Sequence, residues 1–222
     1  MTPRPRSWLP LLLYAAAPLA AAACSSGAPR RTYLLTPPMD PKAATTMASK
    51  QRLLVRRVLV PDYLDTTDIL TRSGRDEVKV SATGRWGERL SQGLTHAVGA
   101  DLAQRMPKVA IVQDGSGSAQ RQLRVTITAL DLWPDGRCVM AANWSVVDQD
   151  SSIPVTSGSG TFDSVNSGGT ATVSDANLVD AVARTVGRLA DDIVPHILDV
   201  ADVMASPARA DRSPGSSVLT AD

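Results

Sequence analysis

The sequence is poor in the residue types that most often carry chemistry. Among its 222 residues, only 4% are aromatic, and there are two cysteines and two histidines. His96 and His196 lie far apart, and neither has a ligand-spaced partner beside it, so we expect no metal or other cofactor. The hydrophobic share is 43%, so a core is expected, built mainly from Leu, Val, Ile and Ala.

Motifs of common enzyme classes are also missing. The sequence has no G-x-S-x-G elbow, no P-loop, no G-x-G-x-x-G and no H-E-x-x-H. We therefore predict that the protein is not an enzyme. A Ser–His–Asp arrangement is spatial, so an anchored hydrolase that depends on His96 or His196 stays open as an alternative.

The charge balance is nearly neutral. The chain has 23 basic and 22 acidic residues, and two of the basic ones, Arg4 and Arg6, lie in the first 23 residues. The remainder therefore carries a net charge of −1. This balance argues against a nucleic-acid partner, and no basic cluster in the sequence indicates binding to anionic headgroups.

The N-terminus has the layout of an export signal. Arg4 and Arg6 precede an apolar run that is too short to span a bilayer and contains two prolines. The run ends in Ala-Ala-Ala-Cys24, which resembles the lipobox of bacterial lipoproteins, whose cysteine is acylated. Residues 1–23 are thus predicted to be a lipoprotein signal peptide, with Cys24 lipidated. Conventional cleavage after Ala23, an A-x-A site, remains the alternative.

The rest of the chain divides into three parts. Residues 24–50 carry the lipidated cysteine, a tether and a short strand. Residues 51–205 form a single domain, and residues 206–222, rich in Ser, Pro, Ala, Arg and Asp, are expected to be disordered. If Cys24 carries lipid, Cys138 has no disulfide partner and is expected to lie buried in a strand.

Hydrophobic periodicity predicts the elements of this domain. Strands are expected near residues 32–35, 53–60, 69–72, 77–80, 109–112, 123–132, 137–147 and 155–165. Helices are expected from Trp86 to Met106 and from a cap at Ser174 to about Pro195, which bends or ends the second one. The apolar phase slips between Ala129 and Leu130, which indicates a β-bulge. The fold class is α+β, a largely antiparallel sheet with two main amphipathic helices packed on one face.

One set of segments is more specific than any single motif. Three segments follow one another within a short stretch: Val60-Pro-Asp-Tyr-Leu-Asp65, Ile69-Leu-Thr-Arg72 and Arg85-Trp-Gly-Glu-Arg-Leu90. In these segments, and from about Cys24 to Ile193, the chain resembles the ABC-type transport auxiliary lipoproteins, the PqiC-like family. The signature residues, which either hold the fold or bind a partner, are Pro61, Asp62, Tyr63, Leu64, Thr71, Arg72, Trp86, Glu88 and Leu90.

These residues also have a local interpretation. Asp62 is expected to fix the turn after Pro61 by bonding the backbone two residues on. Tyr63 and Leu64 would then fold over the end of the sheet. We further hypothesise an ion pair between Arg72 and Glu88.

The resemblance implies a non-catalytic accessory subunit of a lipid transport system. Its partners would be an MCE-domain protein and ABC-type or related inner-membrane components. Ser25 follows the anchor cysteine where an inner-membrane retention signal usually has Asp, which favours the periplasmic face of the outer membrane. A homo-oligomer would fit the family. The alternative is a stand-alone periplasmic lipoprotein that binds a lipid or small molecule in an apolar pocket between sheet and helices.

Overall fold

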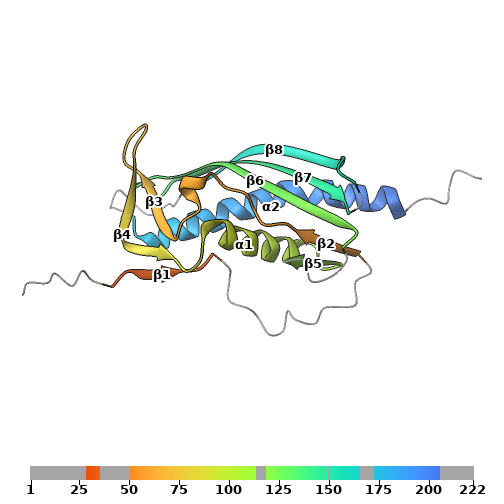
Figure 1. The fold of residues 1–222 in the computed structure, drawn as a ribbon, viewed down its shortest axis with the longest axis horizontal. Helices are drawn as coiled ribbons and strands as arrows, with labels where there is room; N and C mark the ends of the chain where they lie inside the picture. The colour runs from red at the N-terminus through yellow and green to blue at the C-terminus, as the bar shows by residue number, and fades with distance from the viewer. Residues whose placement is uncertain (1–28, 36–50, 114–118, 150, 166–172, 206–222) are drawn as a thin grey trace, which may run out of the picture.

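The computed structural model describes residues 29–35, 51–113, 119–149, 151–165 and 173–205, with side chains up to residue 199. The predicted α+β class is confirmed (Figure 1). The elements in chain order are β1 (Arg31–Tyr33), β2 (Gln51–Val55), the 3-10 helix η1 (Asp62–Leu64), β3 (Asp68–Arg72), β4 (Val78–Trp86), α1 (Leu90–Arg105), β5 (Val109–Gln113), β6 (Arg121–Leu132), β7 (Cys138–Asp148), β8 (Pro154–Ser164) and α2 (Asp175–Ala205).

The strands form two sheets instead of one. The large sheet has the order β5-β2-β6-β7-β8, and the small sheet has the order β1-β4-β3. Strands joined by short turns, such as β6-β7-β8 and β3-β4, pair antiparallel. In contrast, β2 pairs parallel with both β5 and β6, and β1 pairs parallel with β4. Long connections separate these partners along the chain, and such connections permit parallel pairing.

The longest hairpin confirms two local predictions. The register between β6 and β7 shifts between Ile127 and Ala129, where the phase slip predicted a bulge. The turn from Trp133 to Gly136 joins the two strands, with the amide of Trp133 donating to the carbonyl of Arg137. Gly136 has a φ of 86°, a conformation that residues with a Cβ rarely adopt.

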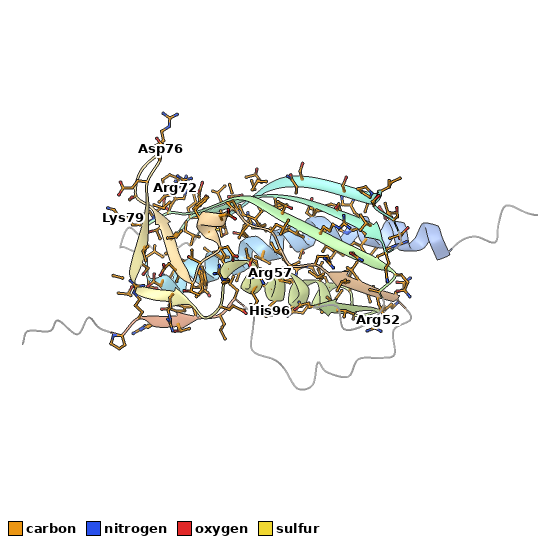
Figure 2. The ribbon with its side chains drawn as sticks, viewed as in Figure 1. Arg52, Arg57, Arg72, Asp76, Lys79 and His96 are labelled. Atoms are coloured by element: carbon orange, nitrogen blue, oxygen red, sulfur yellow. The ribbon has the colours of Figure 1, made fainter. Side chains whose placement is uncertain are left out.

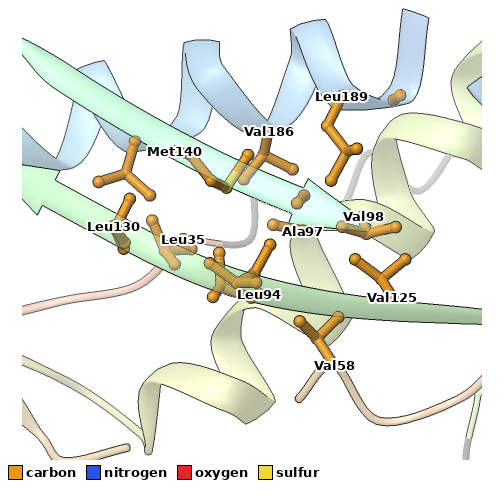
Figure 3. Close-up of a cluster of buried hydrophobic side chains, with 14 of the residues drawn as sticks. Leu35, Val58, Leu94, Ala97, Val98, Val125, Leu130, Met140, Val186 and Leu189 are labelled. Atoms are coloured by element: carbon orange, nitrogen blue, oxygen red, sulfur yellow. The ribbon is translucent and has the colours of Figure 1, made fainter. Parts of the chain in front are cut away.

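The core lies between the large sheet and the two helices (Figure 3). Leu94 and Val98 of α1, with Leu189 of α2, pack against strand residues such as Val125 and Met140, and all five are almost fully buried. Dispersion and burial of aliphatic side chains therefore provide most of the stabilisation, as the low aromatic content predicted.

Two tryptophans complete the core. Trp86 and Trp144 are 4% and 2% exposed, as expected for core anchors. The indole Nε1 of Trp144 donates to Asp192 of α2 at 2.9 Å, so the polar edge of this buried ring is satisfied.

The first helix begins later than predicted. Trp86 ends β4, and α1 starts at Leu90. The strand continues because the Trp86 amide donates to the carbonyl of Thr67 at 2.8 Å and the Gly87 amide donates to that of Tyr33 at 2.7 Å. These ladder bonds hold the backbone extended where the apolar spacing alone suggested a helix.

The second helix has the predicted cap. Ser174 Oγ accepts from the amide of Asn177 at 3.4 Å, and α2 then continues through Pro195 to Ala205, so Pro195 does not end it. At this end α2 meets β4, because Thr83 donates to Asp175 at 2.5 Å and a Cβ on Gly84 would clash with the Asp175 carboxylate. Of the helices described, none is both long and apolar enough to cross a membrane.

Some predicted regions lie outside the described residues. These are the signal peptide at 1–23, Cys24 with most of the tether to residue 50, and the tail at 206–222.

Cys138 is buried in β7, as predicted, and is fully inaccessible. Burial raises the pKa of its thiol to about 11, and the thiol is therefore protonated at neutral pH. In a Cys24→Ser variant, where Cys138 is the remaining thiol, we expect alkylation by iodoacetamide at pH 8 to be at least ~100-fold slower in the native state than in guanidinium. Equal rates in the two states would contradict the buried position.

Candidate functional site

The signature segments meet where η1 and the strands β3 and β4 lead into α1. We call residues 61–66 together with 86–91 the signature junction. The amide of Ser91 donates to the Asp65 carboxylate at 3.2 Å, and the Arg89 guanidinium donates to the Asp65 carbonyl at 2.7 Å. The amide of Leu90 donates to the carbonyl of Thr66 at 3.1 Å. The turn after η1 is thus fastened to the first turn of the helix.

Asp65 supplies the negative charge that the start of α1 otherwise lacks. The N-cap residue is Arg89, which makes no side-chain cap, and the first turn contains no acidic residue. Burial raises the pKa of Asp65, but hydrogen bonds from Ser91 and the charges of Arg89 and Arg57 outweigh this effect. The net result is a pKa below the ordinary value of 3.8, so the carboxylate is charged at neutral pH and stabilises the helix N-terminus.

Arg57 forms a second attachment to α1 (Figure 2). Its Nε and one terminal nitrogen donate to Ser91 Oγ at 3.0 and 2.8 Å. The next amide, that of Val58, donates to Thr95 Oγ1 at 2.9 Å. The segment after β2 therefore lies along the helix in a fixed position.

Sequence reasoning did not select Asp65, Arg57 or Ser91 as site residues. The signal for Asp65 was present in the sequence, because it is the last residue of the Val60–Asp65 motif. No sequence signal identified its partner.

Three signature residues hold the fold. Leu64, Trp86 and Leu90 are 5%, 4% and 3% exposed and belong to the hydrophobic core. Their apolar side chains face inward at the end of η1, the end of β4 and the start of α1. For these three, the fold-holding interpretation is sufficient.

The η1 turn is closed by its backbone. The Leu64 amide donates to the Pro61 carbonyl at 2.9 Å, and the Asp65 amide donates to the Asp62 carbonyl at 3.2 Å. The expected folding over the sheet is seen for Leu64, whereas Tyr63 is 49% exposed. Asp62 is exposed as well. The turn therefore presents Tyr63 and Asp62 to solvent.

The hypothesised pair between Arg72 and Glu88 is wrong. Arg72 Nε donates to Asp131 Oδ1 at 2.7 Å, and Glu88 Oε1 lies 3.1 Å from His96 Nδ1. The arginine is on the side of the β3–β4 hairpin, whereas His96 is on α1 (Figure 2). Because β3 lies beside the end of β6, the nearest carboxylate is that of Asp131, which is remote in sequence.

The last signature residue, Thr71, and the two histidines lie at separate places and do not form a common site. Thr71 is partly buried in β3, and its hydroxyl lies 3.5 Å from the carbonyl of Lys79 across the hairpin. His196 packs against Trp144 in a tilted arrangement, with ring centroids 5.1 Å apart and an interplanar angle of 48°, whereas His96 pairs with Glu88. Within the described ranges, no group of three or more His, Cys, Asp or Glu side chains is placed to hold a metal ion.

An open hollow of about 770 Å³ lies on the large sheet. Its lining includes Arg124, Thr126, Asn143 and Ser145, which alternate along β6 and β7 with buried residues that face the helices. The hollow is therefore on the outer face. The alternative interpretation placed a pocket between sheet and helices, but that layer is filled by the core cluster.

Comparison with known proteins identifies relatives over most of the chain. Residues 33–194 match the model of a family described as "ABC-type transport auxiliary lipoprotein component". Two curated proteins, each named "Intermembrane transport lipoprotein PqiC", from Escherichia coli (strain K12) and Shigella flexneri, are 29% identical over 124 residues. The match covers 55% of this chain and 66% of theirs, just under two thirds of the relatives' length.

Solved structures share the fold. A crystal structure titled "uncharacterized protein" has a TM-score of 0.61 and 21% identity, covering 76% of this chain and 98% of its own. A protein from Xanthomonas campestris has a TM-score of 0.59 and 17% identity, with coverage of 80% and 99%.

The contacts of Asp65 predict a pH-dependent stability. We expect Asp65→Asn to lower the free energy of unfolding by about 1 kcal/mol at pH 7, because it removes the charge at the helix N-terminus. A lowered pKa in the folded state gives stability that is present above the unfolded pKa and is lost as the pH falls through the folded pKa. The difference between wild type and variant should therefore shrink as the pH falls below 3.8. Urea unfolding at pH 7 and pH 3 measures it.

The matched control is Asp62→Asn, which makes the same charge change at an exposed position of the same turn. We expect it to change stability by less than about 0.5 kcal/mol. A similar loss in both variants, or an Asp65→Asn deficit that is undiminished at pH 3, would contradict the role assigned to Asp65.

Proposed function

Because the chain belongs to the family of ABC-type transport auxiliary lipoprotein components, we propose that it is a non-catalytic docking subunit of an MCE/ABC-type lipid transport system in the bacterial envelope. The observation that carries this proposal is the family match over residues 33–194, which include nearly all the described elements. The name of the PqiC relatives, intermembrane transport lipoprotein, supports a role between two membranes.

The proposed anchor is acylated Cys24 in the periplasmic leaflet of the outer membrane. Each buried CH₂ contributes about 0.8 kcal/mol, so several acyl chains on one residue hold a protein durably. Five residue steps separate Cys24 from Pro29, the first described residue. An extended chain spans at most about 3.6 Å per residue, so Pro29 lies within roughly 18 Å of the anchor.

This short reach orients the domain. Figure 1 places β1 at the end of the molecule that also carries β3 and β4. We infer that this end faces the membrane. Leu34, Val78 and Val80, which are 63%, 40% and 48% exposed, lie on or next to these strands. The opposite end, with β5 and the starts of β2 and β6, would face the periplasm.

The proposed partner contact is centred on Tyr63 of η1. Tyr63 is the exposed aromatic residue of the signature, and aromatic and arginine side chains are enriched in interface hot spots. Arg72, held by Asp131 at 2.7 Å, lies near Tyr63 and adds a cationic group to this surface. Tyr63 belongs to the signature junction, whose backbone is held by hydrogen bonds between η1 and α1, so a partner would meet a preorganised surface there.

Anchoring supplies the mechanism of such a subunit. A domain confined to one leaflet has a high effective concentration for a partner that spans the periplasm, even when the contact itself is weak. No chemical step is required of its side chains.

The anchor is tested by changing its cysteine. In Cys24→Ser we expect loss of labelling by a palmitate analogue and transfer of the protein from the outer-membrane fraction to the soluble periplasm. The control is Ser25→Ala, which leaves the cysteine in place and should keep both properties. Labelling retained in Cys24→Ser would exclude Cys24 as the anchor.

The docking surface is tested by affinity capture from detergent extracts. The wild-type chain, co-expressed with the MCE-domain protein of its own host, should recover that protein. Tyr63→Ala should reduce the recovery at least ~10-fold, as expected for a hot-spot aromatic residue. Ile153→Ala is the control, because Ile153 is 75% exposed and lies in the β7–β8 turn.

Each result has a defined meaning. If wild type recovers no MCE-domain protein, the docking function is wrong. If Tyr63→Ala recovers as much as wild type, Tyr63 is not part of the contact. Far-UV circular dichroism of each variant checks that its fold is kept.

A further inference from the structure

Two arginines lie beside each other at the hollow of the large sheet. Val55 of β2 pairs with Leu123 of β6, and the Arg56 amide donates to the Leu123 carbonyl at 2.9 Å. Arg56 directly follows the last residue of β2, and Arg124 is the next residue of β6, so the two arginines continue this register; both side chains are exposed. Like charges directly opposite each other on adjacent strands destabilise a sheet.

No described carboxylate relieves this repulsion. Of the ion pairs formed within the described ranges, none includes Arg56 or Arg124. The residues that line the hollow include no acidic side chain. A bound anion would supply the missing charge, and two adjacent guanidinium groups match the oxygens of a phosphate.

The floor of the hollow offers further hydrogen-bond donors. Arg124 pairs with Ser145 across β6 and β7, and Thr126 pairs with Asn143. These four residues line the hollow on the outer face. The hydroxyl and amide groups lie beside the arginines, so an oxygen-rich headgroup would find donors as well as charge.

Apart from Arg57, which is bonded to Ser91 of α1, the remaining lining is mostly apolar. Leu59 is 61% exposed, yet its backbone is fixed, because its amide donates to Val125 at 3.0 Å and its carbonyl accepts from Ile127 at 2.8 Å. Leu54 lines the same hollow. A free phosphate would leave these leucines unused, and the volume of about 770 Å³ is in the range of sites for much larger ligands.

We propose that this hollow binds a phospholipid headgroup. Arg56 and Arg124 bind the phosphate, the donors on β6 and β7 bind the polar headgroup, and Leu54 and Leu59 contact the glycerol and the first acyl carbons. The site stands on these residues alone and does not rest on the docking function proposed above.

The test is a calorimetric titration at low salt. The chain from residue 24 onward, with Cys24→Ser, is titrated with dihexanoyl phosphatidylglycerol below its micelle concentration. We expect saturable 1:1 binding. Arg56→Gln and Arg124→Gln should each weaken it about 10-fold, the loss of one charge-assisted contact. Arg184→Gln, which removes an exposed arginine from α2, should bind as wild type does.

A second pair of measurements separates the headgroup from a simple anion. Leu59→Ser should weaken binding of the lipid and leave binding of inorganic phosphate unchanged. The proposal is overturned if phosphate binds as tightly as the lipid, if Arg56→Gln and Arg124→Gln bind the lipid as wild type does, or if a glutamate-rich peptide binds and the lipid does not.

The result is independent of partner docking. Arg56→Gln should recover the MCE-domain protein as well as wild type does, because Arg56 lies outside the proposed contact at Tyr63. Failure of lipid binding with docking intact would remove the hollow as a site and leave the docking function standing.

Discussion

The large sheet is covered by helices on one face only, and the rest of the structure depends on this constraint. Side chains alternate across a strand, so each of β6 and β7 must be apolar on one side and polar on the other. Val125 and Trp144 face the helices, whereas Arg124 and Asn143 face outward. Among the described residues, aliphatic side chains pack in the layer between sheet and helices, whereas the hollow lies on the outer face.

The signature junction shows why a short family motif can combine two roles. Leu64 and Trp86 are core residues, and Asp65 holds the uncapped start of α1. These contacts fix the backbone around Tyr63, whose side chain is left half-exposed. The buried residues thus determine the position of the exposed Tyr63 side chain. A partner that contacts Tyr63 would therefore meet a side chain on a fixed backbone.

Features that depend on residues close together in the sequence were predicted correctly, whereas features that depend on tertiary contacts were not. The β-bulge near Ala129, the cap at Ser174 and the buried strand around Cys138 depend on neighbours along the chain, and each was predicted from local pattern. The start of α1 was placed at Trp86 because apolar spacing cannot register ladder bonds to β1 and to Thr67. The partner of Arg72 and the parallel pairing of β2 depend on tertiary neighbours, which periodicity does not encode.

Composition was an incomplete guide to electrostatics for the same reason. A near-neutral chain without a basic run gave no indication of an anion site. Yet folding sorts charge by position: acidic residues such as Asp191 and Asp192 lie on α2, on the far side of the sheet from the hollow. Arg56 and Arg124, remote in sequence, become neighbours when β2 pairs with β6. The local field at a site depends on charges within about a Debye length of it, which is roughly 10 Å. A net charge near zero therefore limits only the average electrostatic potential of the molecule. The potential over one face of the sheet can still be positive where arginines gather.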